Sequence, residues 1–158
     1  GTVSRHYTGQ LISNFAAECT VLRVGSVALV HLAEAHLRGE TVSAAQLQPI
    51  VQPLMQAAVP PDVVVLACTH FPLLRAELTQ VLPPTMRLID SGNAIAKRVQ
   101  MLLQQQGWSA SFPLARQPQP ALFTAITPAV YQLQPVLQQL GFTGIAAWPG
   151  LAAEKTKY

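Results

Sequence analysis

The clearest structural signal in the sequence is the segment Asp62-Val63-Val64-Val65-Leu66-Ala67-Cys68-Thr69-His70-Phe71-Pro72-Leu73-Leu74. Its first part is an unbroken, β-branched apolar run, which predicts a strand buried on both faces, as in parallel sheets. Its second part predicts a helix over residues 72–82 with Pro72 in the first turn, where the missing N–H has no intrahelical partner. Cys68 should therefore lie at the carboxyl end of a buried strand, just ahead of a helix N-terminus.

A junction of this kind is a place where α/β proteins bind ligands, because ligands of open α/β sheets lie outside the carboxyl ends of the strands. The free N–H groups and the dipole of a helix N-terminus favour a thiolate and bind anions such as carboxylates. Thr69 and His70 add a hydroxyl and an imidazole beside Cys68. The alternatives are a cysteine that only packs and a histidine that caps the helix or faces solvent. The residues alone predict a cysteine-centred anion site of unknown reaction.

Composition narrows the class of protein. The chain has 158 residues, half of them hydrophobic and 11% charged, which suits one globular domain or slightly more. A formal charge of +3 without a basic cluster argues against a nucleic-acid partner. No secretion signal and no apolar run of membrane-spanning length occur, so we expect a soluble protein of the reducing cytoplasm, with no membrane partner. The chain starts at Gly1, which we interpret as a processed, tagged or truncated product.

Strand and helix patterns alternate along the rest of the chain. Ser26 should cap one helix that Gly39 ends, and Ser43 with Gln46 forms a capping-box pattern for the next. The other predicted segments are a helix over 4–17, strands over 19–24, 86–90, 121–126 and 144–148, helices over 91–106 and 127–140, a Pro-, Ser- and Gln-rich linker over 109–120, and a frayed end over the last ten residues. This alternation predicts an α/β fold with a mostly parallel sheet and flanking helices, in a flavodoxin-like or Rossmann-like three-layer arrangement.

Other polar residues have simpler explanations. Cys19 precedes a predicted strand rather than following one, so a structural role is expected. Glu34 lies on a helix with apolar faces, where a solvated glutamate is the simple interpretation. Asp90 and Ser91 fit a helix dipole and an N-cap. A Cys-x-His zinc site lacks a second ligand pair with suitable spacing, so we predict no metal.

The motif Ala67-Cys68-Thr69-His70-Phe71-Pro72-Leu73-Leu74 resembles the second-cysteine motif of glutamate racemases, in the aspartate/glutamate racemase superfamily. Flanking segments fall in the same order as in that family. They are Gly1-Thr2-Val3, Gly25-Ser26 to Glu34, Pro60-Pro61-Asp62, Asp90-Ser91-Gly92 with Ala94-Ile95-Ala96, Thr127-Pro128, and Pro135-Val136-Leu137 to Gly141-Phe142. The resemblance therefore covers nearly the whole chain, to about residue 145.

The resemblance implies a cofactor-independent isomerase that interconverts L- and D-glutamate and supplies D-glutamate for peptidoglycan. In that mechanism two cysteines face opposite sides of the substrate α-carbon, one removing a proton as thiolate and the other delivering one as thiol. Cys68 matches the second cysteine. Thr69 and His70 match residues that contact substrate and assist that cysteine, and Glu34 matches an acidic residue on the same side. Some relatives are activated by a peptidoglycan precursor, which is a further expected partner.

The first cysteine of the family, in an Ala-Cys-Asn-Thr motif, has no match here, and the context of Cys19 differs from it. We therefore expect the C-terminal portion of a glutamate racemase, truncated and inactive by itself. Residues 1–92 would form the second α/β domain, which carries Cys68. Residues 93–158 would form a returning helix, linker, strand and helix that pack on the first domain. Alone, they would expose apolar surface and favour a homo-oligomer.

Two alternatives differ in class. A racemase-derived α/β module could bind a partner without catalysis. A cysteine hydrolase would need a positioned base and an oxyanion site, yet His70 lies only two residues from Cys68 and no Asn or Asp partner is identifiable.

Overall fold

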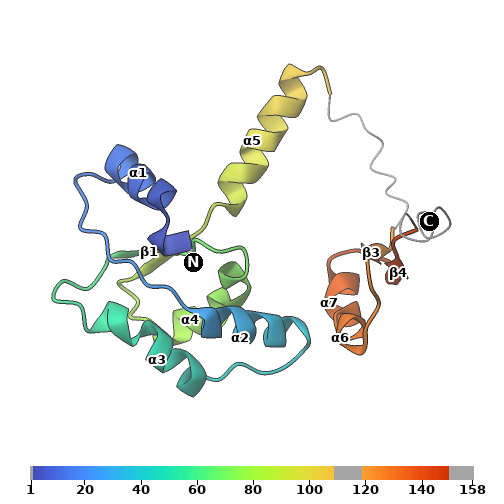
Figure 1. Cartoon of the computed structure of the whole chain (residues 1–158), viewed down its shortest axis with the longest axis horizontal. Coiled ribbons are helices and arrows are strands. Elements are labelled where there is room, and N and C mark those ends of the chain that lie inside the picture. The colour runs from blue at the N-terminus through green and yellow to red at the C-terminus, as the bar shows by residue number, and fades with distance from the viewer. Residues whose placement is uncertain (1, 109–118, 150–158) are drawn as a thin grey trace, which may run out of the picture. The chain divides into compact units, whose positions relative to one another are not determined.

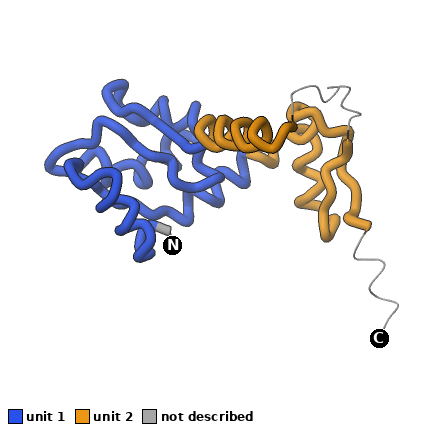
Figure 2. The backbone as a smooth tube through the Cα atoms, turned by 90° about the horizontal axis from the view of Figure 1, so that it is seen from above, with its two compact units in different colours: residues 1–36, 41–91 blue, residues 37–40, 92–158 orange. Residues whose placement is uncertain are grey.

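The computed structural model describes residues 2–108 and 119–149. The chain divides into two compact units, one of residues 1–36 and 41–91 and the other of residues 37–40 and 92–158 (Figure 2). The packing of residues 93–158 on a further domain stays a prediction. Most of the predicted linker, residues 109–118, and the end of the chain, residues 150–158, lie outside the described residues.

The first unit contains most of the helices and one parallel strand pair (Figure 1). Its elements are η1 (Thr2–Ser4), α1 (His6–Phe15), α2 (Val27–Leu37), α3 (Ala44–Met55), β1 (Val63–Val65), the 3-10 helix η2 (Phe71–Leu74), α4 (Arg75–Val81) and β2 (Arg87–Ile89). Strands β1 and β2 are parallel, with Val63 opposite Arg87 and Val65 opposite Ile89. A parallel pair connected through a helix is the α/β unit that the sequence predicts.

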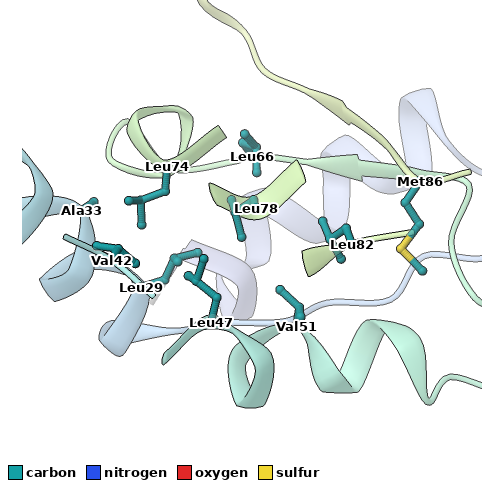
Figure 3. Packing of buried hydrophobic residues seen from close by; sticks show 10 residues of the cluster. All are labelled: Leu29, Ala33, Val42, Leu47, Val51, Leu66, Leu74, Leu78, Leu82 and Met86. Atoms are coloured by element: carbon teal, nitrogen blue, oxygen red, sulfur yellow. The ribbon is translucent and has the colours of Figure 1, made fainter. Parts of the chain in front are cut away.

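The core of the first unit lies between this strand pair and helices α2, α3 and α4. Leu47 of α3 and Leu74 of η2 are fully buried, and Leu78 of α4 is buried in the same cluster (Figure 3). The remaining buried members of the cluster are Leu29, Ala33, Val42, Val51, Leu66, Leu82 and Met86. The apolar faces of three helices thus bury one another and one side of the sheet, the layer arrangement that an α/β unit requires.

Three helix boundaries follow the local signals in the sequence. The Leu29 N–H donates to Ser26 Oγ at 3.0 Å, so Ser26 caps α2 as predicted. The Ser43 N–H donates to Gln46 Oε1 at 2.9 Å, which confirms the capping box of α3. Gly39 follows α2 with a φ of 89°, a left-handed conformation that glycine adopts without steric cost.

Strand β1 differs from its prediction, because it is not buried on both faces. Val65 is 60% exposed, and its partner Ile89 is 41% exposed. Among the described residues the sheet has only these two strands, and the core covers one of its sides. The run of valines has the composition of a strand that is buried on both faces, but the described residues bury only one face of β1.

Two other expectations for this unit are wrong. The segment over residues 19–24 forms no strand, because no described strand pairs with it, and Val21 and Leu22 are exposed. Pro49 and Pro53 predict a kink or an early break in this helix, and the break does not occur, since α3 runs from Ala44 to Met55 through both. Burial of the apolar face of α3 against the core outweighs the backbone hydrogen bonds that the prolines remove.

The second unit has little core of its own among its described residues. It contains α5 (Gly92–Gln105), β3 (Ala121–Phe123), α6 (Pro128–Tyr131), α7 (Gln134–Gln139) and β4 (Ile145–Ala147), with β3 and β4 parallel. The predicted helix over 127–140 is two helices, because Pro135 cannot continue the hydrogen-bond ladder of α6 and instead lies in the first turn of α7, which begins at Gln134. Along α5 the side chains of Ile95, Val99 and Leu102 are all exposed.

Candidate active site

Cys68, Thr69 and His70 lie in the loop that follows β1 and leads into η2, as the sequence predicts. The Leu66 N–H donates to the Ile89 carbonyl at 2.8 Å, so the loop leaves the sheet at the carboxyl end of both strands. The Phe71 N–H then donates to the Cys68 carbonyl at 3.1 Å, which turns the chain into η2. The cysteine is thus presented at the edge of the sheet where α/β proteins bind ligands.

The imidazole of His70 lies against the Cys68 thiol. The Sγ atom of Cys68 is 3.8 Å from His70 Nδ1, and Thr69 Oγ1 is 3.5 Å from the same nitrogen. Cys68 is half-buried, and the side chain of His70 is 36% exposed. One ring nitrogen therefore faces both neighbouring polar groups, and the site stays open to a small molecule.

Glu34 of α2 approaches the other ring nitrogen. Its Oε1 atom is 3.7 Å from His70 Nε2, longer than a normal hydrogen bond but within reach of an ion pair when the ring is protonated. Glu34, His70 and Cys68 consequently form a row of carboxylate, imidazole and thiol. A carboxylate on one nitrogen of a histidine orients the ring and sets which nitrogen carries the proton. The structure brings these three predicted residues together, while their roles remain predictions.

Cys19 lies in the segment between α1 and α2, where it is exposed, and both cysteines are free thiols. No group of three or more His, Cys, Asp or Glu side chains suited to a metal ion occurs within residues 2–108 and 119–149. Nor does any helix in those ranges have the length and apolar character that crossing a membrane demands.

Sequence reasoning missed an ion pair next to the site. Arg75, the first residue of α4, pairs with the Asp90 carboxylate and also donates from Nη1 to the Leu88 carbonyl at 2.8 Å. The interpretation of Asp90 as a residue near a helix dipole was therefore incomplete. A signal was present, because loops that follow neighbouring parallel strands meet at the same sheet edge. An Arg after one strand and an Asp after the next can thus pair.

A second pair joins the helices behind the site. His36 Nδ1 of α2 lies 3.8 Å from Glu77 Oε1 of α4. An open groove of about 620 Å³ between α2 and α3 is mostly apolar and includes His31 and Gln46 in its lining. Neither feature contains Cys68, His70 or Glu34, so both are separate from the candidate active site.

Comparison with known proteins finds glutamate racemases among the most similar relatives. The chain is 49% identical over 148 residues to the glutamate racemase of Salmonella typhimurium, covering 94% of this chain and 51% of that protein. It is 50% identical over 142 residues to the Escherichia coli enzyme, covering 90% of this chain and 49% of that protein. A search against family models gave no match.

A solved structure agrees with these relatives. The crystal structure of Escherichia coli glutamate racemase in complex with L-glutamate and the activator UDP-MurNAc-Ala matches with a TM-score of 0.83 and 48% identity. The match covers 93% of this chain and 54% of that chain.

The fold and the relatives together define the class of this protein: it is an α/β protein related to amino-acid racemases. The chain is a homologue of the glutamate racemases, and it spans about half the length of the curated relatives that it matches. This confirms the predicted family and the α/β fold. The coverage agrees with the expectation of a C-terminal portion.

Proposed function

We propose that this chain carries one side of the active site of a glutamate racemase, an isomerase that interconverts L- and D-glutamate without a cofactor for peptidoglycan synthesis. The observation that carries the proposal is the row formed by Cys68, His70 and Glu34 at the end of β1. It lies in a chain about half identical to glutamate racemases over most of its length. The solved relative, which has L-glutamate bound, supports glutamate as the substrate.

The chemistry proposed for Cys68 is proton transfer at the α-carbon of the amino acid. On one face a thiolate takes the α-proton, so that a C–H bond breaks and an S–H bond forms. On the other face a thiol gives its proton to the same carbon, so that an S–H bond breaks and a C–H bond forms with inverted configuration. Cys68 serves one face, and a cysteine outside this chain serves the other.

His70 would assist Cys68 by holding or taking the thiol proton. If the Nε2–H of a neutral ring is directed to Glu34, the Nδ1 lone pair faces the Cys68 thiol 3.8 Å away. Glu34 would then act by orienting the ring. Thr69, whose side chain lies beside His70, would help to bind the substrate, and the backbone N–H groups of the loop suit its carboxylate.

The proposal requires a partner half. A chimera in which this chain replaces the matching half of the Escherichia coli enzyme should racemise glutamate, while the isolated chain should show negligible turnover. Loss of the circular dichroism signal of D-glutamate measures both. The proposal fails if the folded chimera is inactive, and the half-site idea fails if the isolated chain turns over like a complete enzyme.

Replacing Glu34 by Gln in the chimera should lower kcat by roughly tenfold or more, because the neutral amide orients His70 less well and stabilises its protonated form less. The matched control is Glu40→Gln, which removes an exposed carboxylate from the turn after α2. Steady-state racemisation kinetics measure the effect. An unchanged kcat in Glu34→Gln would remove Glu34 from the proposed row.

The exposed apolar side chains support three further parts of the proposal. Tyr7 and Phe15 of α1, and Val65 of β1, are more than half exposed, as is Ile95 of α5. We infer that residues 1–92 act as the second domain, that residues 93–158 pack on the first, and that the isolated chain self-associates into a homo-oligomer. Sedimentation velocity should show a mass that rises with concentration, and a strictly monomeric chain would contradict the inference.

The proposal also includes the compartment in which the protein acts and the activation of the complete enzyme. A mechanism that depends on free thiols requires a reducing compartment, which supports the cytoplasm. The relative bound to UDP-MurNAc-Ala supports activation of the complete enzyme by a peptidoglycan precursor.

A further inference from the structure

We infer that Arg75 and Asp90 form a clamp that positions the loop carrying Cys68 and His70, an inference that rests on the proposed function of that loop. The sequence does not indicate this role, because Arg75 lies seven residues beyond Cys68 and looks like an ordinary charged residue of an amphipathic helix. In this role Arg75 is a positioning residue. It acts through the loop rather than on the substrate.

The loop is fastened at both ends to the same short piece of β2. At its start the Leu66 N–H donates to the Ile89 carbonyl at 2.8 Å. At its end Arg75 donates to the Leu88 carbonyl at 2.8 Å and pairs with the Asp90 carboxylate. The guanidinium thus closes the loop by holding the first residue of α4 to the carboxyl end of β2.

Inside the loop, the backbone hydrogen bonds of Phe71 and Leu73 are local. The Phe71 N–H donates to the Cys68 carbonyl, and the Leu73 N–H donates to the His70 carbonyl, both at 3.1 Å. Such turns set the shape of the loop but not its position over the sheet. The anchors at Leu66 and Arg75 act together with Leu74, which is buried in the core, and with Glu34 beside the His70 ring, to hold the thiol and the imidazole in place.

An arginine is suited to this task. Its planar fork makes two directed contacts at once, which a single point charge does not. Arg75 is 41% exposed and Asp90 24% exposed, so the pair alone adds little to global stability. Its effect on position can be larger, because a misplacement of about 1 Å between reacting groups can cost roughly 10²-fold in rate.

Hydrogen exchange of the isolated chain, followed by mass spectrometry of its peptides, tests the clamp. In Arg75→Ala and in Asp90→Asn, peptides covering residues 66–74 should exchange at least about tenfold faster, while α3 changes by less than about twofold. The matched control is Arg87→Ala, which removes an exposed arginine from β2, the strand to which Arg75 is fastened.

Alkylation by iodoacetamide links the clamp to the thiol. The rate at Cys68 relative to the exposed Cys19 in the same molecule should rise by about threefold or more in Arg75→Ala, as the opened loop exposes the half-buried thiol. The ratio of the Cys68 rate to the Cys19 rate should stay unchanged in Arg87→Ala.

Three results would overturn the clamp: unchanged exchange over residues 66–74, equal acceleration in α3, or an unchanged Cys68 alkylation ratio. Neither readout depends on racemisation. An inactive chimera would therefore overturn the proposed function and leave the clamp in place. Unchanged exchange and alkylation would overturn the clamp and leave the proposed function in place.

Discussion

Replacing Cys68 by alanine in the chimera should lower glutamate racemisation by roughly 10⁴-fold or more, because one face of the α-carbon then has no thiol to exchange its proton. The substitution removes one sulfur atom from a half-buried, partly open site, so the fold should survive it. Circular dichroism started separately from L- and D-glutamate measures the loss in both directions. We expect both directions to fail together, because each cysteine acts in both.

Cys19→Ser is the matched control for this experiment. It removes the other cysteine of the chain, which is exposed and lies in the segment between α1 and α2. Its activity should equal that of the parent chimera. The Cys68→Ala variant could still eliminate a leaving group from a substrate analogue, since that reaction needs only the opposite thiolate. Full racemisation by Cys68→Ala, or its loss in Cys19→Ser, would contradict the role of Cys68.

Replacing Leu47 by alanine should cost about 2–5 kcal/mol of unfolding free energy, the usual range for a fully buried leucine that leaves a cavity. Leu47 has no exposed surface and belongs to the cluster that joins α3 to α4 (Figure 3). That cost is a large fraction of the stability of a small domain. Urea titration followed by far-ultraviolet circular dichroism measures the change.

Leu22→Ala is the corresponding exposed substitution in the same unit, at a side chain that is 46% exposed. It should change the unfolding free energy by no more than about 0.5 kcal/mol. Equal costs at Leu47 and Leu22 would show that the buried cluster does not hold the unit together.

The parts of the fold that the sequence predicts well depend on neighbours in the chain. Ser26 and Gln46 act within three residues of their partners. Gly39 ends α2 through its own left-handed backbone conformation, which does not depend on distant residues. The strand at Val63–Val65 is equally local, because its run of β-branched residues favours an extended chain. The Cys68-Thr69-His70 site was predictable for the same reason, since it follows directly from the strand-to-helix junction.

The features that were missed depend on distant residues. The segment over 19–24 has a strand composition, but a strand needs a partner, and no described strand supplies one. The pairing of Arg75 with Asp90 requires knowing that β1 and β2 are adjacent, and the survival of α3 through Pro49 requires knowing what its apolar face contacts. Glu34 was assigned by resemblance, since nothing in its own helix shows that His70 lies beside it.

The short crossover between β1 and β2 bears on how the protein is made. The two strands are consecutive, and only η2 and α4 lie between them, so their pairing closes a small loop of chain. Contacts of low sequence separation form early and quickly in folding, and domains emerge from the ribosome with their N-terminal parts first. We therefore expect the segment that presents Cys68 to acquire its structure during synthesis, before translation of residues 92–158 is complete.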